Sequence, residues 1–247
     1  MGAESLSAQS NALRALAERV GTAFDHAVDL ILGCQGRTVI SGMGKSGLVG
    51  RKIAATLAST GTPSFFLHPA EALHGDLGML TPQDLLVLLS YSGETEEVVK
   101  LIPSLKRAGN SLIGITGNPR SLLGKRCDVV LEVAVEREVC PNNLAPTTST
   151  LVTMAMGDAL ACALMKARDF QPMDFARYHP GGALGRRLLT RVCDVMRTQD
   201  LPIVAPDASV QEALFVMTKG RLGTTLVMEG DRLTGIITDG DLRRALL

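Results

Sequence analysis

Two segments rich in glycine and hydroxyl residues could each hold an anion. The first, at residues 41–47, reads SGMGKSG, and the second, at 90–95, reads SYSGET. Each follows an apolar run and precedes a stretch with helical spacing. Glycine lets the backbone approach a ligand closely, and the free N–H groups at the start of a helix favour negative charge. Together the segments predict a cradle for a phosphate monoester.

Each segment has an ordinary alternative. A P-loop resembles the first, but its first glycine would fall on Val39, and no clear Walker-B-type strand ending in Asp follows. An NTPase is therefore disfavoured. The second could be a plain serine N-cap with Glu94 or Thr95 in the first helical turn. The presence of two matching segments after two strands favours ligand binding.

Acid–base groups also gather near loops. They are His68, His74, His179, Glu97 and Glu138. Isomerisation of an aldose needs ring opening, proton transfer between C1 and C2, and stabilisation of an enediolate. Histidine suits the first step, a carboxylate the second, and a lysine or polar donor the third. Neither HExxH nor a close Cys/His pair indicates a catalytic metal, and enediol chemistry does not require one.

Composition excludes several other classes. The 247 residues carry 25 basic and 25 acidic side chains, with no Trp, two Tyr and six Phe, which disfavours nucleic-acid binding. The longest apolar runs are far shorter than a membrane helix, and no signal peptide is evident at Met1. The five cysteines lack CxxC spacing, which favours reduced thiols and a cytoplasmic location.

The elements that must position these groups alternate along the chain. Short apolar runs predict five strands, at residues 37–41, 63–67, 85–90, 111–116 and 128–133. Helical spacing lies between several of them. Near-continuous apolar strands alternating with helices indicate a parallel sheet covered on both faces, so the predicted fold class is α/β.

The remaining helical patterns are less regular. Apolar steps of three and four from Leu13 to Ile31 predict one amphipathic N-terminal helix. Pro103 falls inside the helix expected after Glu94, which predicts a kink or an earlier helix end. Residues 147–170 predict a deeply buried helix, and 175–185 an extended loop.

A second unit begins near residue 192. It is expected to contain a strand at 203–204, a helix at 209–219, a strand pair at 224–228 and 233–238, and a final helix at 239–247. The chain thus divides into domains at residues 1–188 and 189–247. A core of this size is small, so the second unit is expected to need a partner.

Five separated motifs resemble one family. The motifs are SGMGKSG, HPAEALHGDLGM, SYSGETEE, EREVCPNNLAPTTST and HPGGALGRR. Together they resemble the arabinose 5-phosphate isomerases, which contain a sugar isomerase (SIS) domain followed by CBS motifs. The resemblance implies a three-layer α-β-α sandwich with a five-stranded parallel sheet, followed by a small α+β CBS motif. It also implies interconversion of D-ribulose 5-phosphate and D-arabinose 5-phosphate, the precursor of the lipopolysaccharide sugar Kdo.

The resemblance also assigns roles to residues. The catalytically relevant positions of the family fall on Lys45, Glu97, Glu138 and His179. Its phosphate cradle and other substrate contacts fall on Ser41, Ser90, Ser92, Thr95, Gly61, Thr62, His68 and His74. We expect His179 to assist ring opening, Glu138 to move the proton, and Lys45 to stabilise oxyanion charge, with Glu97 orienting or sharing proton transfer. No cofactor is required, and the family's His68 position is associated with an inhibitory zinc only.

The resemblance also raises questions of assembly. Family habit predicts a homotetramer with sites completed across subunits, His179 being the expected contribution from another copy. Residues 235–242, GIITDGDL, resemble a CBS motif, whose Thr and second Asp often contact a nucleotide. CBS motifs normally pair, so a single one predicts a shortened chain or pairing between subunits, and makes nucleotide binding here doubtful.

Two other functions remain open at this stage. One is a non-catalytic SIS module that senses a phosphosugar, although about 35 residues before the first strand leave little room for a helix-turn-helix. The other is an isomerase of the same fold acting on a different sugar phosphate.

Overall fold

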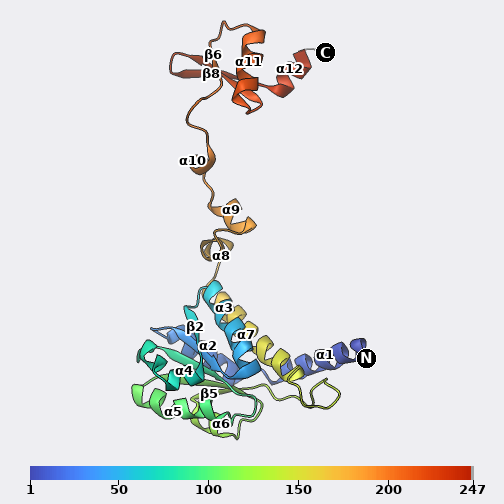
Figure 1. Ribbon diagram of the computed structural model, residues 1–247, viewed down its shortest axis with the longest axis vertical. Coiled ribbons are helices and arrows are strands. Elements are labelled where there is room, and N and C mark those ends of the chain that lie inside the picture. Colours follow the sequence, from blue (N-terminus) through green and yellow to red (C-terminus); the bar gives the residue numbers. More distant parts are fainter. Residues whose placement is uncertain (246–247) are drawn as a thin grey trace. The chain divides into compact units, whose positions relative to one another are not determined.

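The computed structural model of the protein describes residues 1–245 (Figure 1). It contains two compact units, Met1–Leu189 and Thr190–Leu247. The domain boundary expected after residue 188 stays a prediction. Each unit has its own sheet.

The first unit is built on a sheet of five parallel strands, which confirms the predicted class. The strands are β1 (Thr38–Gly42), β2 (Ser64–Leu67), β3 (Leu85–Leu89), β4 (Ser111–Thr116) and β5 (Val129–Glu132). Their spatial order is β2-β1-β3-β4-β5, with every neighbouring pair parallel. This is a doubly wound order, in which the direction of winding reverses between β1 and β3.

Helices cover both faces of this sheet, as Figure 1 shows. One layer contains α1 (Gly2–Arg19), α2 (Thr22–Gly33), α3 (Gly44–Ser59) and α7 (Thr148–Ala167), and the other contains α4 (Pro69–Leu73), α5 (Glu96–Ala108) and α6 (Leu122–Arg126). A short 3-10 turn, η1 (Asp76–Met79), follows α4. Alternate strand residues point to opposite layers, as with Val39 toward α5 and Ile40 toward α7. The result is a three-layer sandwich.

The helix α7 crosses the whole unit and is its longest described element. By length and composition it is also the one described helix that could span a membrane. Half of its most apolar window is buried, and Val152, Leu160 and Leu164 lie in the core against α2, α3 and the sheet. These contacts identify α7 as a core helix of the first unit.

The prediction of a single N-terminal helix was wrong. The chain breaks at Val20 and Gly21, both in extended conformation, and the Gly21 carbonyl accepts the first hydrogen bonds of α2. The apolar spacing continues across this break because both helices face the same core, so periodicity alone did not reveal it.

The prediction of an extended loop at 175–185 was also wrong. This region forms α8 (Pro172–Tyr178) and the start of α9 (Ala183–Leu189). A capping box between Gln171 and Asp174 starts α8, with Pro172 in the first turn. The expected effect of Pro103 was a kink or an early end, but α5 runs through it. Pro103 is exposed there.

The second unit has a three-stranded mixed sheet, and its three strands lie close to the residues predicted for them. It consists of α10 (Val192–Val195), β6 (Ile203–Val204), α11 (Val210–Gly220), β7 (Thr224–Glu229), β8 (Arg232–Thr238) and α12 (Asp239–Ala245). Its core is small, with Val204, Ala213 and Met217 among the buried residues, whereas Phe215 and Ile236 are exposed. Unpaired apolar surface of this kind suits association with a second motif.

An ion pair between a buried carboxylate and a partly exposed guanidinium joins the amino ends of β1 and β3. The Asp84 side chain is only 1% exposed. It accepts hydrogen bonds from the Arg37 backbone N–H (2.7 Å), the Arg37 guanidinium (3.0 Å) and the Thr81 N–H (2.8 Å). Burial raises the pKa of this carboxyl, but the bonds from Arg37 and Thr81 lower it more, to about 2. The paired carboxylate therefore stabilises the fold.

We expect Asp84→Asn to lower the free energy of unfolding of the first unit by about 1–3 kcal/mol at pH 7, because the buried, charged acceptor of the Arg37 and Thr81 hydrogen bonds becomes a neutral amide. The folded pKa lies below the unfolded one, so the contribution is present at neutral pH and is lost as pH falls from about 4 toward 2. Urea unfolding followed by circular dichroism measures both effects. In the control Asp158→Asn, which removes a half-exposed pair with Lys52, the change should stay below about 1 kcal/mol. A pH-independent difference for Asp84→Asn would contradict the prediction.

Candidate active site

The two segments predicted to bind an anion lie at the carboxyl ends of neighbouring strands of the sheet. The first follows β1 and the second follows β3, and these strands are in register, with Gly42 opposite Leu89. The winding of the sheet reverses between these two strands, which opens a crevice at their carboxyl ends. The topology therefore places both predicted loops at the position where ligands bind in doubly wound folds.

Close backbone packing shapes the first loop. A Cβ atom on Gly47 would lie 2.5 Å from the Gly42 carbonyl oxygen, so only glycine lets α3 start this close to β1. Gly44 has a φ of +53° at the turn into the helix. The predicted contact Ser41 is fully buried in β1, and its hydroxyl has no partner among the described residues. Lys45 lies exposed in the first turn of α3.

The second loop is held by its own hydroxyls. The hydroxyls of Ser90 and Thr95 share a 2.7 Å hydrogen bond, and Ser90 Oγ also accepts from the Gly93 N–H at 3.0 Å. Ser92 is exposed, and its Oγ accepts from the Glu94 N–H. Gly93 has a φ of +70°, and a Cβ there would lie 1.9 Å from Ser121 Oγ. The turn therefore requires glycine.

Glu97 is the second residue of α5, the helix that follows this loop. It lies in the first turn of α5, half-buried, two residues after Thr95. This position places Glu97 close in sequence to the hydroxyls of the second loop.

Glu138 is held at the amino end of α7. Its Oε2 accepts hydrogen bonds from the Thr147 N–H (2.8 Å), the Thr147 hydroxyl (2.9 Å) and the Ser149 N–H (3.2 Å). Partial burial raises the pKa of this carboxyl, but the bonds from Ser149 and Thr147 outweigh burial and lower it below the usual glutamate value. The carboxylate is thus ionised at neutral pH, with one oxygen anchored and Oε1 without a hydrogen bond among the described residues.

A cavity of about 330 Å³ joins the three segments. Ser46 lines it from the first loop, Tyr91 from the second, and Glu138 from the segment before α7. Hydroxyls of Thr150 and Thr153 also line it. Of the predicted site residues, Glu138 lines this cavity, whereas Lys45, Glu97 and the predicted hydroxyl contacts Ser41, Ser90, Ser92 and Thr95 are not among its lining residues. A small substrate here could therefore meet the two loops through Ser46 and Tyr91, beside the Glu138 carboxylate.

The two histidines after β2 flank a short helix at the same edge of the sheet. His68 is the N-cap of α4, directly after β2, and His74 is its C-cap. The Nδ1 atom of His68 is buried without a partner among the described residues. His74 is exposed.

The predicted site residues Gly61, Thr62 and His179 lie elsewhere in the unit. Gly61 and Thr62 precede β2, so they lie at the amino edge of the sheet, where Arg168 donates a hydrogen bond to the Thr62 hydroxyl. Phe170 follows α7 and packs against Gly61 and Tyr178. The structure therefore does not bring these residues to the cavity of their own chain.

His179 belongs to this second group. It is the C-cap of α8, its ring stacks on Phe175 at 3.8 Å, and its Nδ1 bonds the Phe175 carbonyl oxygen at 2.9 Å. Glu138 is bonded to the amino end of α7, whereas α8 follows the carboxyl end of that helix, as Figure 1 shows. A helix of 20 residues is about 30 Å long, so His179 and Glu138 lie at opposite ends of α7.

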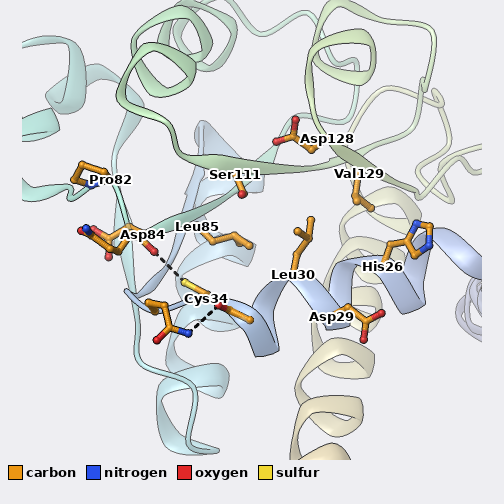
Figure 2. Close-up of a pocket in the computed structure, with 13 residues that line it drawn as sticks. His26, Asp29, Leu30, Cys34, Pro82, Asp84, Leu85, Ser111, Asp128 and Val129 are labelled. Atoms are coloured by element: carbon orange, nitrogen blue, oxygen red, sulfur yellow. Dashed lines mark hydrogen bonds between the residues drawn. The ribbon is translucent and has the colours of Figure 1, made fainter.

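A larger cavity, of about 610 Å³, lies at the amino edge of the sheet. Figure 2 shows α2 on one side, with His26, Asp29 and Leu30, and the amino ends of β3 to β5 on the other. Two of its three carboxylates, Asp84 and Asp128, are already paired, with Arg37 and Lys106. It lies at the opposite edge from the anion-binding loops and is not the candidate active site.

Comparison with known proteins agrees with this geometry. Residues 31–163 match the SIS domain and residues 192–247 the CBS domain. A Haemophilus influenzae protein named "Probable arabinose 5-phosphate isomerase" is 62% identical over 98% of this chain and 72% of its own length. "Arabinose 5-phosphate isomerase KpsF" of Escherichia coli O6:H1 is 58% identical over 98% of this chain and 74% of its own.

The chain belongs to the arabinose 5-phosphate isomerase family. A solved structure from E. coli CFT073, in complex with arabinose 5-phosphate, has a TM-score of 0.69 and 43% identity, covering 71% of this chain and 93% of that one. The SIS and CBS resemblance expected from the motifs is thus confirmed.

Zinc binding at His68 and nucleotide binding at the CBS motif stay predictions. The described residues contain no group of three or more His, Cys, Asp or Glu side chains arranged to hold a metal. In the CBS motif, the Thr238 hydroxyl and N–H donate to Asp241 Oδ2 at 2.7 and 2.8 Å. These two predicted nucleotide contacts therefore cap α12 in the structure.

The sequence did not reveal the hydrogen bonds that hold Glu138 and the segment before it. Thr147 and Ser149 bond Glu138, and the Tyr91 hydroxyl accepts a 3.1 Å hydrogen bond from the Val135 N–H. A signal for the first two was present. The run TTST opens a long apolar helix, and such a helix start favours an anion.

Proposed function

We propose that this protein is an aldose–ketose isomerase that interconverts D-ribulose 5-phosphate and D-arabinose 5-phosphate, which supplies Kdo and lipopolysaccharide synthesis. The observation that carries the proposal is the cavity where Ser46, Tyr91 and Glu138 converge at the switch point of the sheet. Relatives 52–62% identical share the isomerase name, and the arabinose 5-phosphate complex of a 43% identical structure supports the substrate class.

The proposed chemistry uses four side chains. The hydroxyls and helix amides after β3 hold the phosphate, and Ser41 adds a buried hydroxyl. His179 protonates the ring oxygen to open the sugar, and Glu138 carries the proton between C1 and C2 of the open chain. Lys45 stabilises the negative charge that develops on the enediolate oxygen, with Glu97 orienting the substrate or sharing the proton transfer.

Turnover of the purified protein tests the proposed substrate directly. We expect conversion of D-ribulose 5-phosphate to D-arabinose 5-phosphate, and a Glu138→Gln variant with kcat lowered by about 10²–10⁴ rules out a contaminating isomerase. Turnover of a hexose 6-phosphate in place of the pentose would overturn the substrate assignment. Binding of sugar phosphates without any turnover would instead favour a non-catalytic phosphosugar sensor.

The two glutamates can be separated by solvent exchange. Oε1 of Glu138 has no hydrogen bond among the described residues while Oε2 is anchored, which suits a base that carries one proton back and forth. We therefore expect tritium exchange at C2 of the substrate to stop in Glu138→Gln and to persist, slowed, in Glu97→Gln. Exchange that survives in Glu138→Gln would contradict this assignment.

The proposed site also needs a second copy of the chain. His179, Gly61 and Thr62 lie at the far end of α7 from Glu138, so one chain alone does not bring them together. We propose a homotetramer in which the His179 end of one subunit completes the Glu138 cavity of another. The unpaired apolar surface of the CBS motif would pair between subunits in the same assembly.

Subunit mixing tests this composite site. Glu138→Gln and His179→Gln should each be inactive alone, whereas refolding them together in equal amounts should restore about a quarter of the wild-type sites, because some pairs then combine two intact residues. A mixture of Glu138→Gln with Glu97→Gln is the matched control and should show no activity beyond that of the two variants measured separately, since both glutamates come from one subunit. No recovery in the first mixture, with assembly confirmed by size, would contradict the composite site.

The remaining assignments follow from the same family. We propose that the enzyme needs no cofactor, that it works in the cytoplasm, and that zinc at His68 would inhibit it. All five cysteines are unpaired in the structure, which supports a reducing compartment.

A further inference from the structure

The carboxylate assigned to proton transfer stands on an irregular segment. The chain has no helix or strand between β5, which ends at Glu132, and α7, which begins at Thr148. We call residues 138–147 the Glu138 loop. Its polar backbone groups must find partners within the loop or in water, so these partners decide where Glu138 lies.

One side chain of the loop holds the Glu138 backbone. The Asn143 side-chain oxygen Oδ1 accepts a 2.6 Å hydrogen bond from the Glu138 N–H. Asn143 has a φ of +53°, a left-handed conformation that asparagine tolerates better than most residues. Its own N–H donates to the Cys140 carbonyl oxygen at 2.9 Å, which closes the turn.

A second side chain holds the other half of the loop. The Cys140 sulfur accepts hydrogen bonds from the N–H groups of Leu144 and Ala145, both at 3.1 Å. These bonds lower the pKa of the Cys140 thiol. They connect the segment that carries Glu138 to the segment that leads to Thr147, the residue that binds the Glu138 carboxylate twice.

We propose that Cys140 and Asn143 are positioning residues for Glu138: the sulfur and the amide oxygen fold the loop so that the carboxylate reaches the amino end of α7. The role rests on the proposed isomerase function. It is distinct from packing, because the loop covers little core: Leu144 is 80% exposed and Asn143 is exposed. Of the two, Asn143 also lines the cavity and Cys140 does not, so Cys140 separates positioning from substrate contact.

The decisive variants are Cys140→Ala, which removes the acceptor, and Cys140→Ser, which keeps a smaller one. Asn143→Gly removes the amide but suits the positive φ. The control Cys162→Ala removes an exposed thiol from the opposite half of α7. The charged residues that share the cavity, Glu136 and Arg137, stay unchanged in all variants.

We expect Cys140→Ala and Asn143→Gly to lower kcat about 10- to 100-fold with little change in KM, because a displaced base lowers reactivity more than binding. The acid limb of kcat/KM should move to higher pH, since the bonds that lower the pKa of Glu138 become misaligned. Cys140→Ser should recover most of the activity. Thermal unfolding should match that of the wild type and of Cys162→Ala.

Each other result overturns the inference in a recognisable way. An unchanged kcat and pH profile in Cys140→Ala would show that the sulfur does not position Glu138. A rise in KM alone would indicate substrate contact, and a loss of activity that tracks a fall in melting temperature, without recovery in Cys140→Ser, would indicate a purely structural role. A wild type that is inactive on ribulose 5-phosphate would instead refute the proposed function itself.

Discussion

The anchoring of Glu138 at the amino end of α7 is the interaction on which the site depends. The N-cap residue Thr147 makes no capping bond with its own side chain, and the Glu138 carboxylate takes the helix N–H groups instead. An anion at this end is also favoured by the dipole of a 20-residue helix. The helix α7 is buried against α3 and the sheet. Its amino end therefore holds the carboxylate in a fixed position, although the loop that carries Glu138 is exposed.

The strand order of the sheet determines where the two predicted anion-binding loops lie. Winding that reverses between β1 and β3 leaves the carboxyl ends of these strands uncovered by a crossover helix. The glycines at 42, 47 and 93 then let helix and loop backbone approach that edge closely. The proposed phosphate binding and proton transfer would thus depend on different elements, which meet at the cavity lined by Ser46, Tyr91 and Glu138.

Local features of the site were predictable from the sequence, and contacts between distant segments were not. The two predicted anion-binding loops consist largely of glycine and hydroxyl residues that directly follow apolar runs. The apolar runs alone were sufficient to predict the five strands. The break at Gly21 was missed because the apolar spacing continues through it. The helix α8 was not predicted, because the proline and glycines that follow it are typical of a loop. Its signal in the sequence was the capping box of Gln171 and Asp174. The tie between Glu138 and Thr147 depends on how an irregular loop folds back, which no periodicity records.

The length of α7 gives a physical reason why such an isomerase would assemble. A helix long enough to cross the sheet carries Glu138 at one end and leads to His179 at the other, about 30 Å away. No side-chain motion within one subunit closes that distance, since Val152 and Leu164 hold both halves of α7 in the same core. If both residues act on one sugar, a second subunit must supply one of them, and catalysis then depends on assembly. A sensing module has no such need, because a phosphate cradle at one edge of the sheet is sufficient for binding.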